Sequence, residues 1–298
     1  MILAVAGGSI AANVYLDIYG IFRDPRGRHL LVYGDERIAK YLLNERYVPA
    51  KFNAVMIGSS VSANWRLDKI FQLRTFNNSV NGGNIVEEKS IVEQALSRPG
   101  IQFALLIVHP YLTHSHDFET VPLTPRLRRA ALGSLSLWDA YKARIRMGLH
   151  LETQLFDEFG AQDFGTARKD LNPTLKRMME GNGDFEVDRN ALASYRDVVS
   201  ELHAHGVQVV FVVPPLEERL LAPKRAALEN YFNMIRPTMT AQDKVIDFTS
   251  KEFADFCADP RNFQDGVHLL PDGAARVVSV IDALIWDWIA RGEVRGPA

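Results

Sequence analysis

Five short runs of aliphatic, β-branched and aromatic residues recur along the chain and constrain its fold more than any other feature. They are bounded by turn residues and cover 52–57, 75–80, 103–108, 207–213 and 244–248. Segments with apolar residues at helical spacing alternate with them, at 85–96, 189–205 and 272–290. Strands that alternate with helices favour a parallel sheet with helices on both faces. We therefore expect a three-layer α/β/α sandwich around a central parallel sheet.

Residues 112–188 do not fit this alternation. They contain basic helix-like stretches and a glycine-rich interruption at 181–184, without a convincing buried strand. A stretch of this kind indicates an insertion, mainly helical, that lies over the sheet. We expect a single domain over 23–298 with this insertion at about 112–188.

Composition excludes several classes of protein. A chain of 298 residues with 47% hydrophobic residues has enough apolar material for a large core. Its formal charge of -2 lacks the basic excess of a nucleic-acid-binding protein. The single cysteine, Cys257, excludes an internal disulfide framework and a cysteine-rich zinc site. No catalytic context surrounds Cys257, so we expect a buried small residue there, and we expect no cofactor.

The N-terminal segment introduces a membrane as a possible partner. Residues 1–16 are nearly all apolar or small before Asp17 interrupts them. They fall short of the ~20 residues of a spanning helix. They also lack the lysine or arginine that precedes the apolar region of a signal peptide. Two interpretations remain open. Residues 1–22 are a membrane anchor or signal remnant, which implies an extracytoplasmic location, or they are a buried helix of a cytoplasmic protein.

Gly58, Ser59 and Ser60 follow the first predicted strand directly. Ligands of open parallel sheets bind at the carboxyl ends of the strands, so a serine here lies where chemistry usually takes place. A helix that begins just after it would direct amide groups at a developing oxyanion. The alternative is that Ser59 or Ser60 only caps that helix.

Asp265 and His268 favour the catalytic interpretation. They lie three residues apart just before the last predicted helix, a spacing that allows the carboxylate to hold one imidazole nitrogen while the other faces outward. A serine, a histidine and an orienting acid make up a general-base-activated nucleophile. The alternative for this pair is a surface histidine beside an aspartate that caps a turn.

With these residues the sequence resembles the SGNH, or GDSL-like, hydrolases, in the membrane-associated branch whose first motif reads G-[ST]-S. The segment IGSSVSANW is similar to the first block, FNNSVNGGN to the second and DGVHLLPDG to the Asp-x-x-His block, while DIYGIFRD resembles the wording that follows the anchor in this branch. The resemblance implies a flavodoxin-like SGNH fold, with Ser60 as nucleophile, His268 as base and Asp265 as its orienting acid. It also implies carbohydrate-linked acetyl groups as substrates, since this branch is related to exopolysaccharide-modifying proteins.

The sequence departs from this family where the oxyanion donors should be. Ser79 occupies the place of a glycine whose amide serves the oxyanion, and the asparagine of the third block is missing because His109 follows the strand. A serine keeps its backbone N–H, so Ser79 is still expected to donate. Asn81, Asn84 and His109 are possible substitutes for the asparagine, with His109 the first choice by position, and Gly82 lies among them. A histidine satisfied by a neighbouring carbonyl is the alternative for His109.

Two further patterns are less specific. His114, His116 and Asp117 have a spacing compatible with metal ligands, but no fourth ligand is evident and an exposed polar loop explains them better, so we predict no metal site. Residues 124–147 combine apolar positions with Arg126, Arg128, Arg129, Lys142, Arg144 and Arg146. That segment either faces an anionic polymer or lipid headgroups, or is the solvated side of an amphipathic helix.

These observations predict a serine-dependent ester hydrolase or O-acyl transferase that acts on a carbohydrate-linked ester. Its partners are an acyl-ester substrate and, through the N-terminus, a membrane; no nucleic acid is expected. The alternative is a catalytically inactive carbohydrate-binding or assembly component that kept the fold. A hydrogen bond between Ser60 and His268, with His268 paired to Asp265, favours the enzyme.

Overall fold

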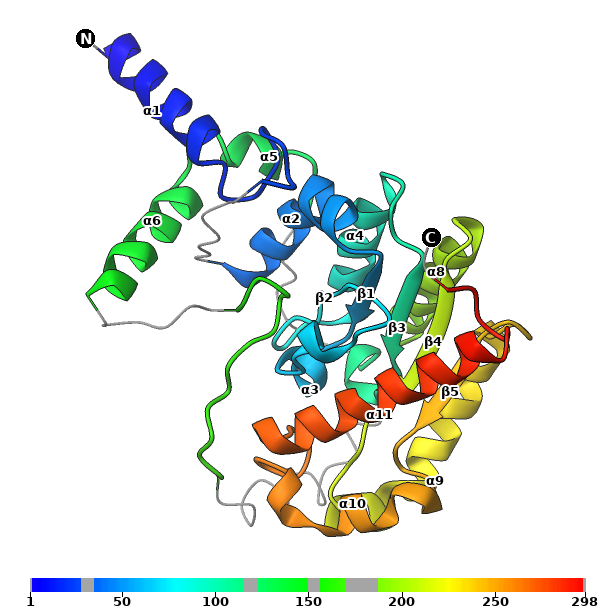
Figure 1. Cartoon of the computed structure of the whole chain (residues 1–298). Helices are drawn as coiled ribbons and strands as arrows, with labels where there is room; N and C mark the ends of the chain where they lie inside the picture. Colours follow the sequence, from blue (N-terminus) through cyan, green and yellow to red (C-terminus); the bar gives the residue numbers. More distant parts are fainter. Residues whose placement is uncertain (1, 28–34, 115–122, 150–155, 170–186, 297–298) are drawn as a thin grey trace.

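The computed structural model describes residues 2–27, 35–114, 123–149, 156–169 and 187–296 (Figure 1). The strands are β1 Ala54–Ile57, β2 Thr75–Asn77, β3 Phe103–Ile107, β4 Gln208–Val213 and β5 Lys244–Asp247. The α-helices are α1 Ile2–Leu16, α2 Glu36–Lys51, α3 Ser60–Ala63, α4 Ile85–Leu96, α5 Leu127–Ala130, α6 Leu135–Gly148, α8 Arg189–Ala204, α9 Glu218–Ile235, α10 Ala254–Ala258 and α11 Pro271–Ala290. Short 3-10 turns include η1 Leu67–Lys69, η2 Pro110–Leu112 and η4 Arg236–Thr238.

The strands form one parallel sheet in the order β2-β1-β3-β4-β5. This is the flavodoxin-like order. The chain first places β2 on one side of β1 and then crosses over to place β3 on the other side. Every residue of β1 and β3 is buried, as expected for a sheet covered on both faces. The predicted three-layer α/β/α fold is confirmed. The switch point at β1 and β3 is where such sheets bind ligands.

Helices cover both faces of the sheet. On one face α4 packs between α2 and α8, and η4 at the end of α9 reaches α8. On the other face α11 contacts η1, and Figure 1 shows α11, in red, crossing in front of the strands. Their boundaries follow from local chemistry. Asp35, Asn84 and Asp188 accept amide hydrogens at the N-termini of α2, α4 and α8.

The N-terminal helix and part of the insertion lie beside each other, away from the sheet (Figure 1). Asn13 of α1 donates to the carbonyl of Leu132 at 2.8 Å and accepts from the Tyr141 hydroxyl of α6 at 2.7 Å. Within the residues that the structure describes, no helix combines the length and apolarity needed to cross a membrane. Whether 1–22 act as an anchor stays a prediction.

The rest of the described insertion returns to the sheet. Residues 156–169 contain neither helix nor strand and pass along the edge at β2. The amide of Asn77 donates to the carbonyl of Phe159 at 2.7 Å, and the amide of Gln162 donates to the carbonyl of Ala63 at 2.8 Å. Gly160 touches this edge closely, because a Cβ there would lie 2.3 Å from the Asn77 carbonyl oxygen. The insertion therefore reaches the end of the sheet where Ser60 lies.

Candidate active site

Ser60 is held at the carboxyl end of β1 by a close turn. It is the first residue of α3, and Ser59 before it pairs with Val80 in an isolated parallel bridge. Gly58 has no room for a side chain, since a Cβ there would lie 2.4 Å from Ser62 Oγ and 2.8 Å from Ile107. The Ser60 side chain is only half-buried, whereas Ser59 is fully buried. The turn therefore presents Ser60, and not Ser59, at the switch point.

His268 connects Ser60 to Asp265. Its Nε2 lies 3.0 Å from Ser60 Oγ, and its Nδ1 lies 2.8 Å and 3.0 Å from the two carboxylate oxygens of Asp265. These distances are those of hydrogen bonds that link a nucleophile, a general base and an acid that orients the base. The structure thus brings Ser60 to His268, which follows it by 208 positions in the sequence.

The carboxylate of Asp265 is held in its ionised form. Burial alone would raise the pKa of Asp265, but the hydrogen bond from the His268 ring and the charge of that ring, together with the backbone amides of His268 and Val267, outweigh it. The net result is a pKa below the usual value of an aspartate. An ionised Asp265 fixes the proton of His268 on Nδ1, which leaves Nε2 free to accept the proton of Ser60.

The insertion supplies a wall beside these three residues that was not predicted from the sequence. The ring of Phe164 packs edge-on against the His268 imidazole, with centroids 5.7 Å apart. Gln264 fixes this wall, because its side chain donates to the Phe164 carbonyl at 2.9 Å and its own carbonyl accepts from the amide of Lys169 at 3.0 Å. Phe164 therefore shields one side of the base from water.

A cavity of about 580 Å³ opens next to Phe164. Asn64 lines it at the end of α3, where its Nδ2 donates to the Leu269 carbonyl at 2.7 Å and ties α3 to the loop of His268. Half of the other lining residues are apolar and most of the rest are charged: Arg66, Lys69, Phe156, Asp157, Ala161, Gln162, Asp163, Phe164, Thr166, Pro271, Ala274 and Ala275. A small organic group bound here would contact Phe164, which packs against the His268 ring.

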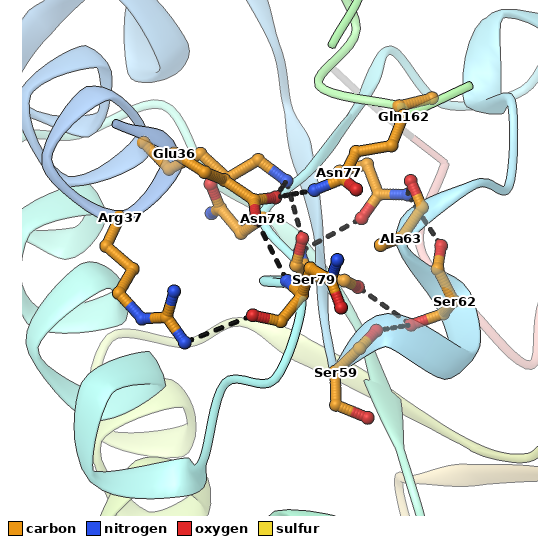
Figure 2. Close-up of polar contacts among 12 residues, drawn as sticks. Glu36, Arg37, Ser59, Ser62, Ala63, Asn77, Asn78, Ser79 and Gln162 are labelled. Carbon is orange, nitrogen blue, oxygen red and sulfur yellow. Dashed lines mark hydrogen bonds and ion pairs between the residues drawn. The ribbon is translucent and has the colours of Figure 1, made fainter. Parts of the chain in front are cut away.

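Side chains of the second block form hydrogen bonds with α3, as Figure 2 shows. Ser79 Oγ lies 2.8 Å from Ser62 Oγ, and Asn77 donates its side-chain amide to the carbonyl of Ser62 at 2.8 Å. The backbone amide of Ser79 donates to Asn77 Oδ1 at 2.9 Å. This bond occupies the amide that we expected to serve the oxyanion, and Ser79 is fully buried. We therefore reassign Ser79 from donor to a residue that positions α3.

A buried ion pair on α2 holds the second block in turn. Lys40 is fully buried, lies 3.0 Å from Glu36 and donates to the Ser79 carbonyl at 2.5 Å. Glu36 accepts from the amide of Asn81 at 3.0 Å and from the side chain of Gln162 in the insertion. A buried lysine needs such partners, because an unpaired charge in the interior is costly. The pair links α2, the second block and the insertion.

The other predicted residues of the second block have structural contacts. Asn84 caps α4, where its Oδ1 accepts from the amides of Val86 and Glu87. Gly82 has a φ of +64°, a left-handed conformation that favours glycine before this cap. Arg37 donates to the carbonyl of Asn81 at 3.1 Å (Figure 2), and the Asn81 side chain is exposed. Within the described structure, no hydrogen bond or ion pair connects these three residues to Ser60 or His268.

His109 is the remaining candidate donor. It follows β3, the neighbour of β1, and its Nδ1 accepts from the amide of Tyr111 at 3.3 Å. Burial, with a smaller contribution from the nearby charge of His268, lowers the pKa of His109 from 6.5 to about 4. The ring is therefore neutral at physiological pH, and because Nδ1 accepts, the proton lies on Nε2. A neutral N–H donor thus lies near His268.

We expect His109 to make the protein less stable in mild acid. The folded protein holds the ring neutral down to pH about 4, whereas the unfolded chain takes up a proton near pH 6.5. The stability that His109 contributes is present above pH ~6.5 and is lost as the pH falls toward 4, by about 3 kcal/mol in total. Urea unfolding of wild type and His109→Gln between pH 7 and pH ~4.5 measures how steeply the free energy of unfolding of each protein falls with pH. The fall should be smaller for His109→Gln.

His205→Gln is the matched control, because its side chain is 43% exposed. It should keep the pH dependence of the wild type. Equal slopes for wild type and His109→Gln would mean that the His109 ring is not held neutral in the folded state.

The metal prediction concerns residues that are only partly described. His114 lies in the described structure, whereas His116 and Asp117 lie outside the described residues. Among the residues that the structure does describe, no three histidine, cysteine or acidic side chains group as metal ligands. Cys257 is buried, as predicted, and burial raises the pKa of its thiol to about 11.

Neither a protein-family model nor a curated protein matches the sequence. Solved structures with similarity include a lipase/acylhydrolase from Enterococcus faecalis, with a TM-score of 0.41, 12% identity and coverage of 82% of this chain and 98% of that chain. They also include a candidate platelet activating factor from Streptococcus pneumonia, with a TM-score of 0.47, 10% identity and coverage of 84% and 90%. At these values the likeness assigns no chemistry, which rests on the geometry at Ser60.

Proposed function

We propose that the protein is a serine-dependent ester hydrolase or O-acyl transferase of the SGNH type. The observation that carries this proposal is the continuous hydrogen-bonded chain from Ser60 through His268 to Asp265. Such a chain is the arrangement that activates a serine hydroxyl. The inactive alternative would predict a gap or a filling side chain between Ser60 and His268, and a bond of 3.0 Å lies there instead.

The chemistry follows from the positions of these atoms. Ser60 Oγ attacks the acyl carbon of the ester while its proton moves to His268 Nε2. Collapse of the tetrahedral intermediate breaks the bond to the leaving oxygen, which takes that proton and departs as an alcohol. A water or an acceptor hydroxyl then gives its proton to His268 and attacks the acyl group on Ser60. The bond to Ser60 Oγ breaks as that oxygen takes the proton back from His268, which restores the free serine. Hydrolysis and acyl transfer differ only in this last nucleophile.

In this proposal His109 supplies the side-chain donor to the oxyanion, with the backbone amide of Ser60 as the other donor. His109→Leu should therefore lower kcat on the order of a hundredfold with little change in KM, since a lost donor costs ~3 kcal/mol in the transition state. His109→Gln keeps an N–H donor and should retain more activity. Steady-state kinetics on a soluble acetyl ester measure both. If His109→Leu keeps the wild-type kcat, another group serves the oxyanion.

The substrate class that we propose is a carbohydrate-linked acetyl ester, and the location is extracytoplasmic. The support for both is the resemblance of the three motif blocks to exopolysaccharide-modifying SGNH proteins. The mixed apolar and charged lining of the cavity beside Phe164 is compatible with an acetylated sugar.

If transfer to a sugar is the main reaction, water should be a slow acceptor. Small activated esters should then acylate Ser60 and release the acyl group slowly, because a positioned hydroxyl recovers several kcal/mol that free water does not. Time courses of acyl-enzyme decay with and without acetyl-accepting oligosaccharides measure this step. Faster decay with the oligosaccharide supports transfer. Rapid decay in buffer that no acceptor changes would leave an ordinary esterase.

A further inference from the structure

The lobe formed by α1, α5 and α6 carries most of the exposed apolar side chains of the described structure. We call it the helical lobe; it projects from the body of the domain (Figure 1). Of the eleven large apolar side chains that are exposed in the described residues, six lie on it or at its ends: Ile10, Tyr15, Leu135, Trp138, Ile145 and Leu149. Apolar exposure concentrated in one place marks an interaction surface, whereas isolated apolar residues need no explanation.

Four of these side chains lie on one side of α6. Leu135, Trp138, Ile145 and Leu149 follow one another at steps of three, seven and four residues, which is the repeat of a single helix face. They are 58% to 81% exposed. The core-facing side of the same helix is already occupied, because Leu137 and Ala140 are buried. Helix α6 thus has a second, largely apolar face, interrupted by Lys142, which pairs with Asp139. No residue of the described structure covers its apolar side chains.

Helix α1 extends this surface. It has no charged side chain over its 15 residues, and residues 6–12 are all exposed. A helix without charged residues is normally buried or inserted into an apolar phase. The two bonds of Asn13, to Leu132 and to Tyr141, fix α1 beside α6. The apolar parts of both helices therefore belong to the same lobe.

The charges of the helical lobe indicate what covers it. Arg126, Arg129 and Arg144 are exposed and form no ion pair with any residue that the structure describes. Uncompensated arginines next to apolar side chains complement the negative headgroups and acyl chains of an anionic membrane. Trp138 and Tyr15 are of the residue types that concentrate at the membrane–water interface. A purely apolar protein partner would leave these arginines without counter-charges.

We propose that α1 and α6 form one docking surface that binds the interface of a membrane containing anionic lipid. The apolar face of α6 lies in the boundary between headgroups and acyl chains, with Arg126 and Arg129 against the phosphates. This proposal does not depend on the chemistry at Ser60. It differs from an anchor formed by the N-terminus alone, because it requires the side chains of α6.

Co-sedimentation of the full chain with vesicles tests the surface. Wild type should bind vesicles of phosphatidylcholine mixed with phosphatidylglycerol more tightly than vesicles of phosphatidylcholine alone, and added salt should weaken the binding. The double variant Trp138→Ser, Ile145→Ser should bind on the order of tenfold more weakly to both vesicles. Arg126→Gln and Arg129→Gln should each weaken binding roughly fivefold, and only to the mixed vesicles.

Trp286→Ser on α11 is the matched control, since Trp286 is 57% exposed outside the helical lobe. It should bind as wild type does, and thermal unfolding should confirm that each variant is folded. The proposal is overturned if wild type does not bind the mixed vesicles, or if the Trp138 and Ile145 double variant binds as well as Trp286→Ser. It is also overturned if that double variant instead abolishes self-association in vesicle-free solution, which would assign the face to a second copy of the chain.

Discussion

Replacing Ser60 with alanine is expected to lower ester turnover by ~10⁴-fold or more, to the rate of residual catalysis by the rest of the site. In the proposed reaction the hydroxyl oxygen of Ser60 forms the covalent bond to the acyl group, and no other serine hydroxyl in the described structure is bonded to His268. Turnover of a soluble acetyl ester by purified Ser60→Ala and wild type measures the loss.

Ser59→Ala is the control for this substitution. Ser59 precedes Ser60 directly, yet its Oγ is buried and has no hydrogen-bond partner among the described residues. Its removal should leave turnover within a few-fold of wild type. Equal losses from both substitutions, or a loss from Ser59→Ala alone, would mean that the nucleophile has been assigned to the wrong serine.

Replacing Asp265 with asparagine is expected to lower kcat by about 10⁴-fold, the cost seen when the acid of such a triad becomes an amide. The amide oxygen can still accept from the backbone of Val267 and His268, so the loop should keep its shape. The amide no longer stabilises a protonated His268 and favours the tautomer with its proton on Nε2, which cannot accept from Ser60. Steady-state kinetics at neutral pH measure the loss.

Asp259→Asn is the matched control for this change. Asp259 lies six residues before Asp265 and also accepts a backbone amide hydrogen in a turn, but it pairs with the exposed Arg261. It should keep nearly full activity. If Asp265→Asn remains within tenfold of wild type, Asp265 has only a structural role in the loop.

The sheet could be predicted from the sequence because a buried parallel strand has a local signature. Each of the five observed strands lies within its predicted run, and α4 has the predicted bounds Ile85–Leu96. Helix α8 lies within its predicted segment, 189–205, and Gly206 adopts a φ of +71° just beyond it. Helices α2 and α9 were not predicted. Each contains a proline, at Pro49 and Pro223, which obscures a helical pattern.

The triad was predictable for a different reason. Ser60 lies close after a recognisable strand. Asp265 and His268 lie only three residues apart, so their pairing can be predicted from the sequence. The supports of the triad have no such signal. Lys40 belongs to a helix rich in charged residues, where a lysine is usually solvated, and only the folded chain shows that it is buried against the Ser79 carbonyl. Phe164 lies in an insertion without regular structure, and its contact with His268 depends on the path of the whole segment.

The roles of the second block depend on hydrogen bonds that sequence alone does not reveal. The motif placed Ser79 near the nucleophile, which is correct, because Ser79 contacts Ser62 of α3. It did not reveal that Asn77 takes the Ser79 amide hydrogen. For His109 the position after β3 was informative, whereas the neutral state of its ring follows from burial.

Labelling of the full chain with a fluorophosphonate, followed by peptide mass mapping, tests the central claim most directly. The reagent forms a stable bond only with a serine that a neighbouring base activates. The predicted result is a single adduct on the peptide that contains Ser60, lost in Ser60→Ala and retained in Ser59→Ala. A folded wild-type protein that takes up no label, or takes it up on a serine other than Ser60, would contradict a serine nucleophile at the end of β1.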